Sequence, residues 1–191
     1  MEKILLRNIL ECTSGEQLEV LKLRNKESIR RNMYSDHIIT ESEHLKWLVS
    51  LKKKPEQQFF IIFVADQVKG AVSLAAFDFK NRKCDWAFYL DETVRGGLGA
   101  AIEYYFVGYV FDKLKIEKLN CEVLSFNESV IKMHKKFGFQ EEGIRRSNIL
   151  KDSQRIDVVL LGMTAQEWTV HSESVKERYQ SILNKFDIKM A

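Results

Sequence analysis

Proline, glycine and cysteine are all scarce in this chain of 191 residues, and it contains no long apolar run. The three cysteines are widely spaced and form no Cys-x-x-Cys pair. The sequence therefore predicts neither a disulfide framework nor a zinc site, and no metal is expected. No stretch approaches the ~20 apolar residues that cross a bilayer. With no signal sequence either, we expect no membrane partner and a location in the bacterial cytoplasm.

The balance of charge is also modest. Lysine and arginine number 30 against 27 aspartates and glutamates, and the basic residues are scattered along the chain. A nucleic-acid partner is not expected, because such partners favour clustered positive charge. Hydrophobic residues make up 45% and charged residues 30% of the chain, which is typical of a globular protein and not of a disordered one.

Apolar periodicity predicts an α/β protein with a mixed sheet. A strand, a helix and a parallel strand in the middle of the chain are expected to form a right-handed crossover. The expected strands are 4–10, 58–65, 70–79, 84–90, 118–124, 139–150 and 155–163, and the expected helices are 14–27, 40–54, 97–113 and 128–137.

The sequence divides into a domain at 1–164 and a C-terminal helical extension at 165–191. In the extension, Val175, Tyr179, Ile182, Leu183 and Phe186 fall on one helical face. This helix is expected to pack on the domain or on the second subunit of a homodimer.

Three of the nine glycines, Gly96, Gly97 and Gly99, stand where a predicted strand gives way to a long predicted helix. Glycine lets a ligand approach the backbone closely, and a helix N-terminus offers free N–H groups with partial positive charge. We interpret the loop as a phosphate site, with a tight strand-to-helix turn as the alternative. The loop lacks the third glycine of a dinucleotide-binding fingerprint and the Gly-Lys-Ser/Thr of a P-loop.

A second motif, NESVIKMHKKFGF at 127–139, follows the next predicted strand. Together, the two motifs and the element order resemble the GNAT acetyltransferase superfamily over roughly residues 6–163. Gly97 and Gly99 match the small positions of that family's Q/R-x-x-G-x-G/A loop. The first position of the loop is here Val94, and the arginine is displaced to Arg95.

In the second motif, Asn127 and the Phe-Gly-Phe turn at 137–139 match the family pattern. The position that usually holds tyrosine is here His134.

The resemblance implies a twisted, mostly antiparallel sheet, flanked by helices and splayed between its fourth and fifth strands. It also implies acetyl-CoA as cosubstrate, with the diphosphate on the glycine loop and the pantetheine arm between the splayed strands 84–90 and 118–124. A backbone N–H near Phe88 or Tyr89 would hold the acetyl carbonyl. The cofactor-binding residues implied are Phe88, Tyr89, Leu90, Arg95, Gly96, Gly97, Leu98, Gly99, Ala100 and Asn127.

Acetyl transfer to an amine needs a base and an acid. By its position in the motif, His134 would protonate the departing thiolate, and the alternative is a helix-face histidine with no chemical role. Glu122 is the candidate base, because a carboxylate within a buried strand needs a partner or a function. The alternative for Glu122 is a salt-bridged residue of the sheet.

The segment IRRNMYSDHIITESEHLKWL at 29–48 is similar to the N-terminal part of GNAT enzymes of the pseudaminic-acid pathway. That resemblance implies acetylation of the 4-amino group of a UDP-linked 4-amino-4,6-dideoxy sugar. Met33, Tyr34 and Trp47 would then form an apolar substrate pocket. Separately, Asp85 and Tyr89 share a face of the strand beside Glu122, and either could meet the cationic amine. Packing of the second helix on the sheet is the alternative for Met33 and Trp47.

Two other functions remain open at this point. Enzymes that acetylate the N-termini of ribosomal proteins share the element order and a similar Arg-Asn opening. A non-catalytic acetyl-CoA-binding or oligomerisation module would accommodate a histidine in place of the family's tyrosine.

Overall fold

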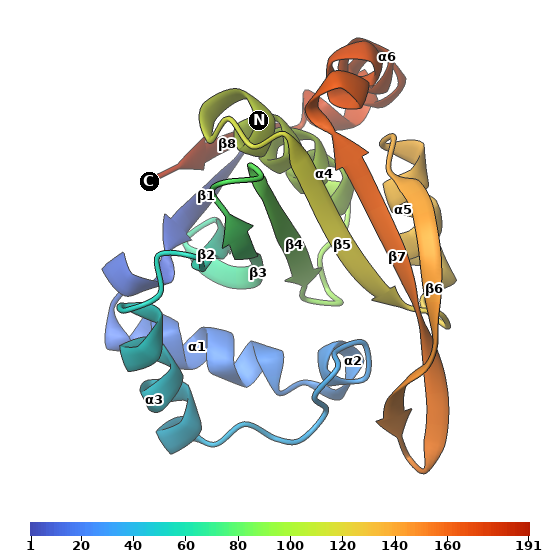
Figure 1. Ribbon diagram of the computed structural model, residues 1–191. Coiled ribbons are helices and arrows are strands. Elements are labelled where there is room, and N and C mark those ends of the chain that lie inside the picture. Colours follow the sequence, from blue (N-terminus) through green and yellow to red (C-terminus); the bar gives the residue numbers. More distant parts are fainter.

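One sheet of eight strands runs through the molecule in the order β6-β7-β5-β4-β3-β2-β1-β8 (Figure 1). The computed structural model describes residues 1–191. The strands are β1 (Glu2–Asn8), β2 (Gln58–Val64), β3 (Gln67–Asp78), β4 (Lys83–Leu90), β5 (Lys118–Leu124), β6 (Gln140–Lys151), β7 (Gln154–Thr164) and β8 (Phe186–Met190).

Six α-helices accompany the sheet, and the predicted elements are present with small shifts at their ends. They are α1 (Ser14–Arg24), α2 (Glu27–Arg30), α3 (Glu41–Leu51), α4 (Leu98–Gly108), α5 (Glu128–Lys136) and α6 (Ala165–Leu183). A 3-10 turn precedes α1 at Ile9–Glu11, and α4 continues into a π-helical turn at Tyr109–Lys113. The first predicted helix, 14–27, ends at Arg24, and the short helix α2 that follows it was not predicted.

Capping fixes where the longer helices begin. Thr40 accepts a hydrogen bond from the Glu43 N–H, and the Glu43 side chain accepts one from the Thr40 N–H. This reciprocal capping box satisfies two donors that would otherwise have no partner. Thr164 and Glu167 form the same arrangement at α6.

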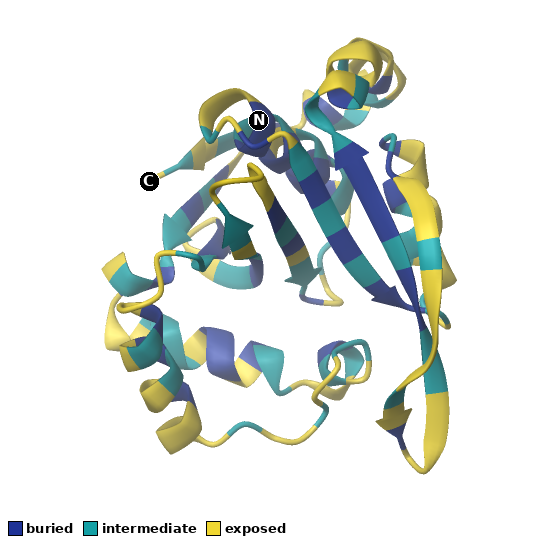
Figure 2. Ribbon diagram, in the orientation of Figure 1, coloured by how far each residue is buried: buried dark blue, intermediate teal, exposed yellow.

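The helices cover opposite faces of the sheet. Figure 1 shows α1, α2 and α3 grouped on one side of the molecule, away from α4, α5 and α6. Ile61 of β2 packs in the cluster under α1 and α3, whereas its neighbour Ile62 packs in the larger cluster that contains α4. Figure 2 shows that β5 and β7 are largely buried, whereas the tip of the β6–β7 hairpin is exposed.

The predicted splay between the fourth and fifth strands is confirmed. The strands β4 and β5 are parallel and pair only from Lys83 with Lys118 to Asp85 with Asn120. Beyond Asp85 the two strands separate, while β4 stays paired with β3 up to Leu90 and β5 with β7 up to Leu124. The sheet is otherwise antiparallel except where β8 joins β1. The split therefore exposes two strand edges to one opening.

The C-terminal segment is helix followed by strand. The expectation that Phe186 lies on the helical face is wrong: α6 ends at Leu183, and Phe186 begins β8, which pairs in parallel with β1 from Glu2. The helix packs on α4, with Trp168 and Val175 buried. The division at residue 164 stays a prediction.

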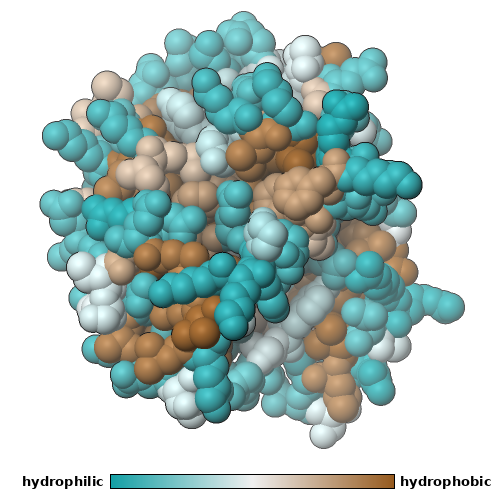
Figure 3. Space-filling model, turned by 60° about the vertical axis from the view of Figure 1, so that its left-hand side comes forward, coloured by the Kyte–Doolittle hydropathy of each residue, from teal (hydrophilic) through white to brown (hydrophobic).

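Apolar side chains on the face shown in Figure 3 lie in separate patches among hydrophilic ones. None of the helices combines the length and apolar character needed to span a bilayer. The homodimer suggested by the sequence stays a prediction.

Candidate active site

A cavity of about 600 Å³ opens where β4 and β5 separate. Residues from both strands, from β3, from α2 and the segment after it, from the first turn of α4 and from along α5 line it. Ten residues selected from the sequence meet here: Met33, Tyr34, Asp85, Phe88, Tyr89, Leu90, Gly99, Glu122, Asn127 and His134.

The glycine loop presents a row of unused hydrogen-bond donors. Backbone N–H groups from Arg95 to Ala100 form no hydrogen bond within the protein, and the N–H of Ala101 is the first of α4 to bond, to the Gly97 carbonyl at 3.2 Å. Gly96 and Gly97 have φ of 79° and 90°, a conformation that glycine adopts without strain. Free N–H groups at the positive end of a helix form a site for an anion.

Two side chains of this loop do not face the anion site. The Arg95 guanidinium donates to the backbone carbonyls of Glu92 and Val94, so it ties the loop to itself. Leu98 is buried in the core, so only its backbone is available to a ligand. Asn127 lies at the start of α5 and lines the cavity, with its side-chain oxygen accepting from the Ser129 hydroxyl at 3.3 Å.

The histidine in the tyrosine position lies inside the protein. His134 is 4% exposed, and its Nδ1 lies 2.7 Å from a carboxylate oxygen of Glu103 on α4. The rings of Trp86 and Phe139 contact the imidazole edge-on or tilted, at centroid distances of 5.4 and 5.3 Å. Nε2 forms no hydrogen bond within the protein, and His134 lines the cavity. The residue is therefore placed to exchange a proton with a ligand.

Glu122 is held by two partners at the cavity wall. One of its oxygens accepts from Arg145 on β6 at 2.5 Å, and the other accepts from the hydroxyl of Tyr34. Burial and the hydrogen bond to Glu122 raise the pKa of Tyr34, so its hydroxyl stays protonated and donates. The salt bridge expected as the structural alternative is present, and the carboxylate also lines the cavity.

The cavity reaches residues of both sheet faces. His134 packs among the residues of the α4 side, whereas Glu122 and Asp85 lie on the alternate face of their strands. Asp85 accepts a hydrogen bond from the Asn120 amide at 3.1 Å, where the pairing of β4 and β5 ends. A ligand between the strands can therefore contact His134 on one face and Glu122 on the other.

A second, smaller cavity of about 410 Å³ adjoins the first. Met33 and Tyr89 line both cavities, and Trp47 lines only this one, packing edge-on against Phe59 at 5.1 Å. Nη1 of Arg24 and Nε2 of His44 are buried here without a hydrogen-bond partner. The cavity thus combines apolar rings with unused polar groups, as small-molecule sites do.

The family model of the acetyltransferase (GNAT) domain matches residues 17–160. This chain belongs to the GNAT family. It is therefore an N-acetyltransferase, as the residues in the two motifs had implied.

Two curated relatives align over most of the chain. The SPbeta prophage-derived uncharacterized N-acetyltransferase YokL of Bacillus subtilis is 27% identical over 147 residues, or 76% of this chain and 83% of that protein. Acetyltransferase PseH of Campylobacter jejuni is 26% identical over 136 residues, or 71% of this chain and 84% of that protein.

A solved structure shares the fold at low sequence identity. Spermidine N-acetyltransferase from Vibrio cholerae, in complex with CoA and spermine, superimposes with a TM-score of 0.79 at 17% identity. The match covers 87% of this chain and 98% of that one.

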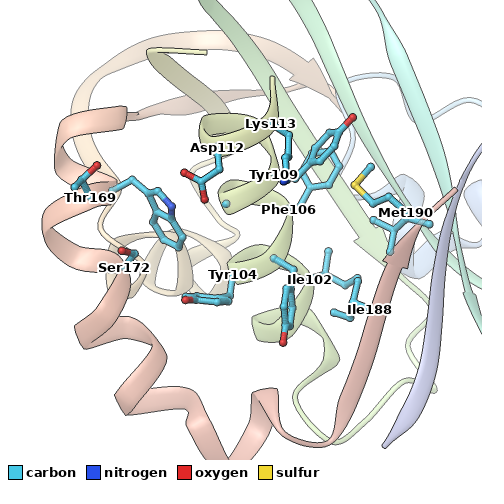
Figure 4. Close-up of a pocket in the computed structure, with 14 residues that line it drawn as sticks. Ile102, Tyr104, Phe106, Tyr109, Asp112, Lys113, Thr169, Ser172, Ile188 and Met190 are labelled. Carbon is cyan, nitrogen blue, oxygen red and sulfur yellow. The ribbon is translucent and has the colours of Figure 1, made fainter. Parts of the chain in front are cut away.

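This GNAT domain has a further cavity of about 530 Å³, which contains none of the residues selected from the sequence. Figure 4 shows Tyr104 and Asp112 of the α4 region on the side of Thr169 and Ser172 of α6, and Tyr109 on the side of Met190 of β8. It lies beside the C-terminal helix, apart from the split between β4 and β5.

Three residues of this GNAT site were not selected from the sequence. Arg145 holds the candidate base, Glu103 holds the candidate acid, and Arg24 lines the aromatic cavity. Glu103 had a signal in the sequence: it is the only charged residue in the apolar helix segment LGAAIEYYFVG. Arg145 had none, because its role depends on how β6 and β7 bring it to Glu122.

Proposed function

We propose that this enzyme transfers the acetyl group of acetyl-CoA to the 4-amino group of a UDP-linked 4-amino-4,6-dideoxy sugar. The observation that carries the proposal is the pair of cavities with shared lining residues, one at the split between β4 and β5 and one lined by aromatic rings. The similarity to acetyltransferase PseH and the pattern at 29–48 support the sugar as acceptor.

The residues around the split fit acetyl-CoA. The free N–H groups from Arg95 to Ala100 would bind its diphosphate, and charge-assisted hydrogen bonds of this kind contribute about 1.5–3 kcal/mol each. The unpaired edges of β4 and β5 would take the pantetheine arm as an added strand. Acetyl-CoA supplies the activated acyl group, and a backbone N–H near Phe88 or Tyr89 would stabilise the oxyanion.

Two side chains would handle the protons. Glu122 would take a proton from the attacking amine, since Arg145 holds one of its oxygens in place at the cavity wall. His134 would give a proton to the sulfur, because it lines the cavity from the other side of the sheet and its Nε2 is free of the bond that Nδ1 makes with Glu103. Neither role needs a metal ion.

The adjoining cavity would hold the nucleotide sugar. Trp47, Phe59 and Met33 offer apolar surface to a base or to the methyl group of a 6-deoxy sugar. The unpartnered Nη1 of Arg24 would donate to a phosphate or carbonyl oxygen. Burial lowers the pKa of His44, which favours a neutral ring that can bond to a polar group of the substrate.

The test is CoA release by the purified enzyme with acetyl-CoA and either the UDP-amino sugar or a panel of N-terminal peptides. We expect turnover with the sugar, and a product heavier by one acetyl group. Turnover with peptides alone would overturn the proposal in favour of an N-terminal acetyltransferase. Binding of acetyl-CoA without turnover on either acceptor would favour a non-catalytic module.

A further inference from the structure

Glu103 is the one acidic side chain in the interior of α4, and the chemistry proposed above does not use it. It is 0% exposed, and one of its oxygens, Oε1, lies 2.7 Å from Nδ1 of His134. Its other oxygen, Oε2, is buried without any hydrogen-bond partner. A carboxylate buried in this position must be either neutral or paired with a positive charge, because an uncompensated charge in a protein interior is strongly unfavourable.

Burial favours states in which Glu103 and His134 together carry no net charge. Burial raises the pKa of Glu103, and this effect outweighs the charge and the hydrogen bond of His134, which both lower it. An ionised Glu103 beside a neutral imidazole would leave one negative charge without a cation. The favoured states therefore have a net charge of zero.

Zero net charge restricts where the protons lie. One proton is shared between Oε1 and Nδ1, and the second can lie on Nε2 or on Oε2. Oε2 has no acceptor to receive a hydrogen bond, so a proton there would be a buried, unpaired donor. Nε2, by contrast, belongs to a residue that lines the cavity. The second proton is thus on Nε2.

We infer that Glu103 is a positioning residue that keeps Nε2 of His134 protonated and directed into the cavity, ready to donate to the sulfur of a leaving thiolate. This inference rests on the proposed acetyl transfer. As the C–S bond breaks, its electron pair stays on sulfur, the Nε2–H bond breaks, and an S–H bond forms. Glu103 and His134 together are left with one negative charge, and solvent returns the proton once CoA has gone.

The surroundings contain no other group that would neutralise Glu103. The rings of Trp86, Phe88 and Phe139 face His134 and carry no charge. Burial raises the pKa of Cys121, so it stays a neutral thiol. Other titratable groups that line the cavity are Asp85, which accepts a hydrogen bond from Asn120, and Glu122, which is paired with Arg145. Burial raises the pKa of Tyr34 and of Tyr89, so both phenols in the cavity stay neutral. Around α5 lie Lys135, paired with Glu141; exposed Lys136; and His171, beside Gly138.

The first test reads the histidine directly and needs no acceptor. Histidine-labelled enzyme is studied by nitrogen NMR across neutral pH, and His134 is assigned among the four histidines by its loss in His134→Gln. We expect a protonated Nε2. A bare Nε2 with the proton only on Nδ1 would overturn the inference. Because no acceptor is present, failure of the sugar as a substrate affects only the proposed function.

The second test is the pH profile of kcat for Glu103→Gln, with Glu173→Gln, an exposed change on α6, as the matched control. Without the carboxylate, the alkaline limb should move down by about one to three pH units, because the negative partner no longer holds the proton. The kcat at neutral pH should fall about tenfold or more, with unchanged affinity for acetyl-CoA. An unaltered profile and rate would refute the inference. If Glu103→Gln does not fold, the NMR of the unaltered enzyme decides.

Discussion

Two glycines of the same loop should respond differently to an added side chain, one with a loss of CoA affinity and the other with a loss of stability. In Gly99→Val, an added Cβ would lie 3.6 Å from Leu90 and 4.0 Å from Phe88, which are ordinary contacts. Gly99 does not have a positive φ, and it lines the cavity. The fold should therefore tolerate the substitution, while the new side chain occupies the proposed phosphate site.

The magnitude follows from the hydrogen bonds at stake. Displacing the diphosphate from one charge-assisted N–H bond removes about 1.5–3 kcal/mol, which raises the Kd for CoA roughly 10- to 150-fold. The free energy of unfolding should change by less than about 1 kcal/mol, the span of helix propensities for such a residue.

Gly97→Ala is the matched comparison. Gly97 has φ of 90°, and an added Cβ would come within 2.7 Å of Ile182 on α6. The left-handed conformation alone costs about 1–2 kcal/mol for a residue with a side chain. For a chain of this length, a loss of about 2 kcal/mol lowers Tm by roughly 4–8 °C.

Calorimetric titration with CoA and thermal unfolding separate the two variants. We expect Gly99→Val to lose affinity at nearly unchanged Tm, and Gly97→Ala to lose Tm. A Gly99→Val enzyme with wild-type affinity for CoA would refute the assignment of the phosphate site to this loop.

Three further substitutions test other parts of the site. Glu122→Gln should lower kcat and alter the acidic limb of its pH profile; an unchanged profile would leave Glu122 a structural role only. Trp47→Ala should raise KM for the sugar nucleotide without affecting CoA affinity. Leu45→Ala, exposed on the same helix, should leave both KM and CoA affinity unchanged. Burial acts to raise the pKa of Asp91, but hydrogen bonds from Lys26 and Thr93 lower it to about 2. Ionised Asp91 therefore stabilises the folded state above its unfolded pKa of about 3.9, and this contribution is lost as pH falls toward 2. Lys26→Met removes one of the partners of Asp91 and should lower the unfolding free energy by about 1–2 kcal/mol at neutral pH. Equal stability of that variant and the wild type in urea at neutral pH would contradict the pairing.

Much of the fold could be predicted because its signals are local. Short apolar runs rich in strand-forming residues indicated each strand up to β7, and the predicted helix 40–54 begins at the Thr40–Glu43 capping box, as α3 does. The strand β8 was missed because five residues after a long helix carry too little pattern to end that helix. Its pairing partner, β1, lies at the other end of the sequence.

Motifs identified most of the candidate site in the sequence, and Glu122 was selected as a carboxylate within a buried strand. The glycine loop and His134 stand in recognisable segments, and the structure brings them to one cavity with Glu122. Arg145 belongs to no motif, and its role arises from its tertiary contact with Glu122. Arg24 matches the Arg-Asn pair of the pseudaminic-pathway pattern, but only the structure places it at the aromatic cavity. Glu103 was readable as a lone charge in an apolar helix, but its partner was not.

A crystal structure of the enzyme with CoA tests the central claim most directly. The account predicts the diphosphate on the backbone N–H groups between Arg95 and Ala100, and the pantetheine arm between β4 and β5 beyond Asp85. A diphosphate bound elsewhere, or β4 and β5 joined along their full length around no ligand, would contradict it.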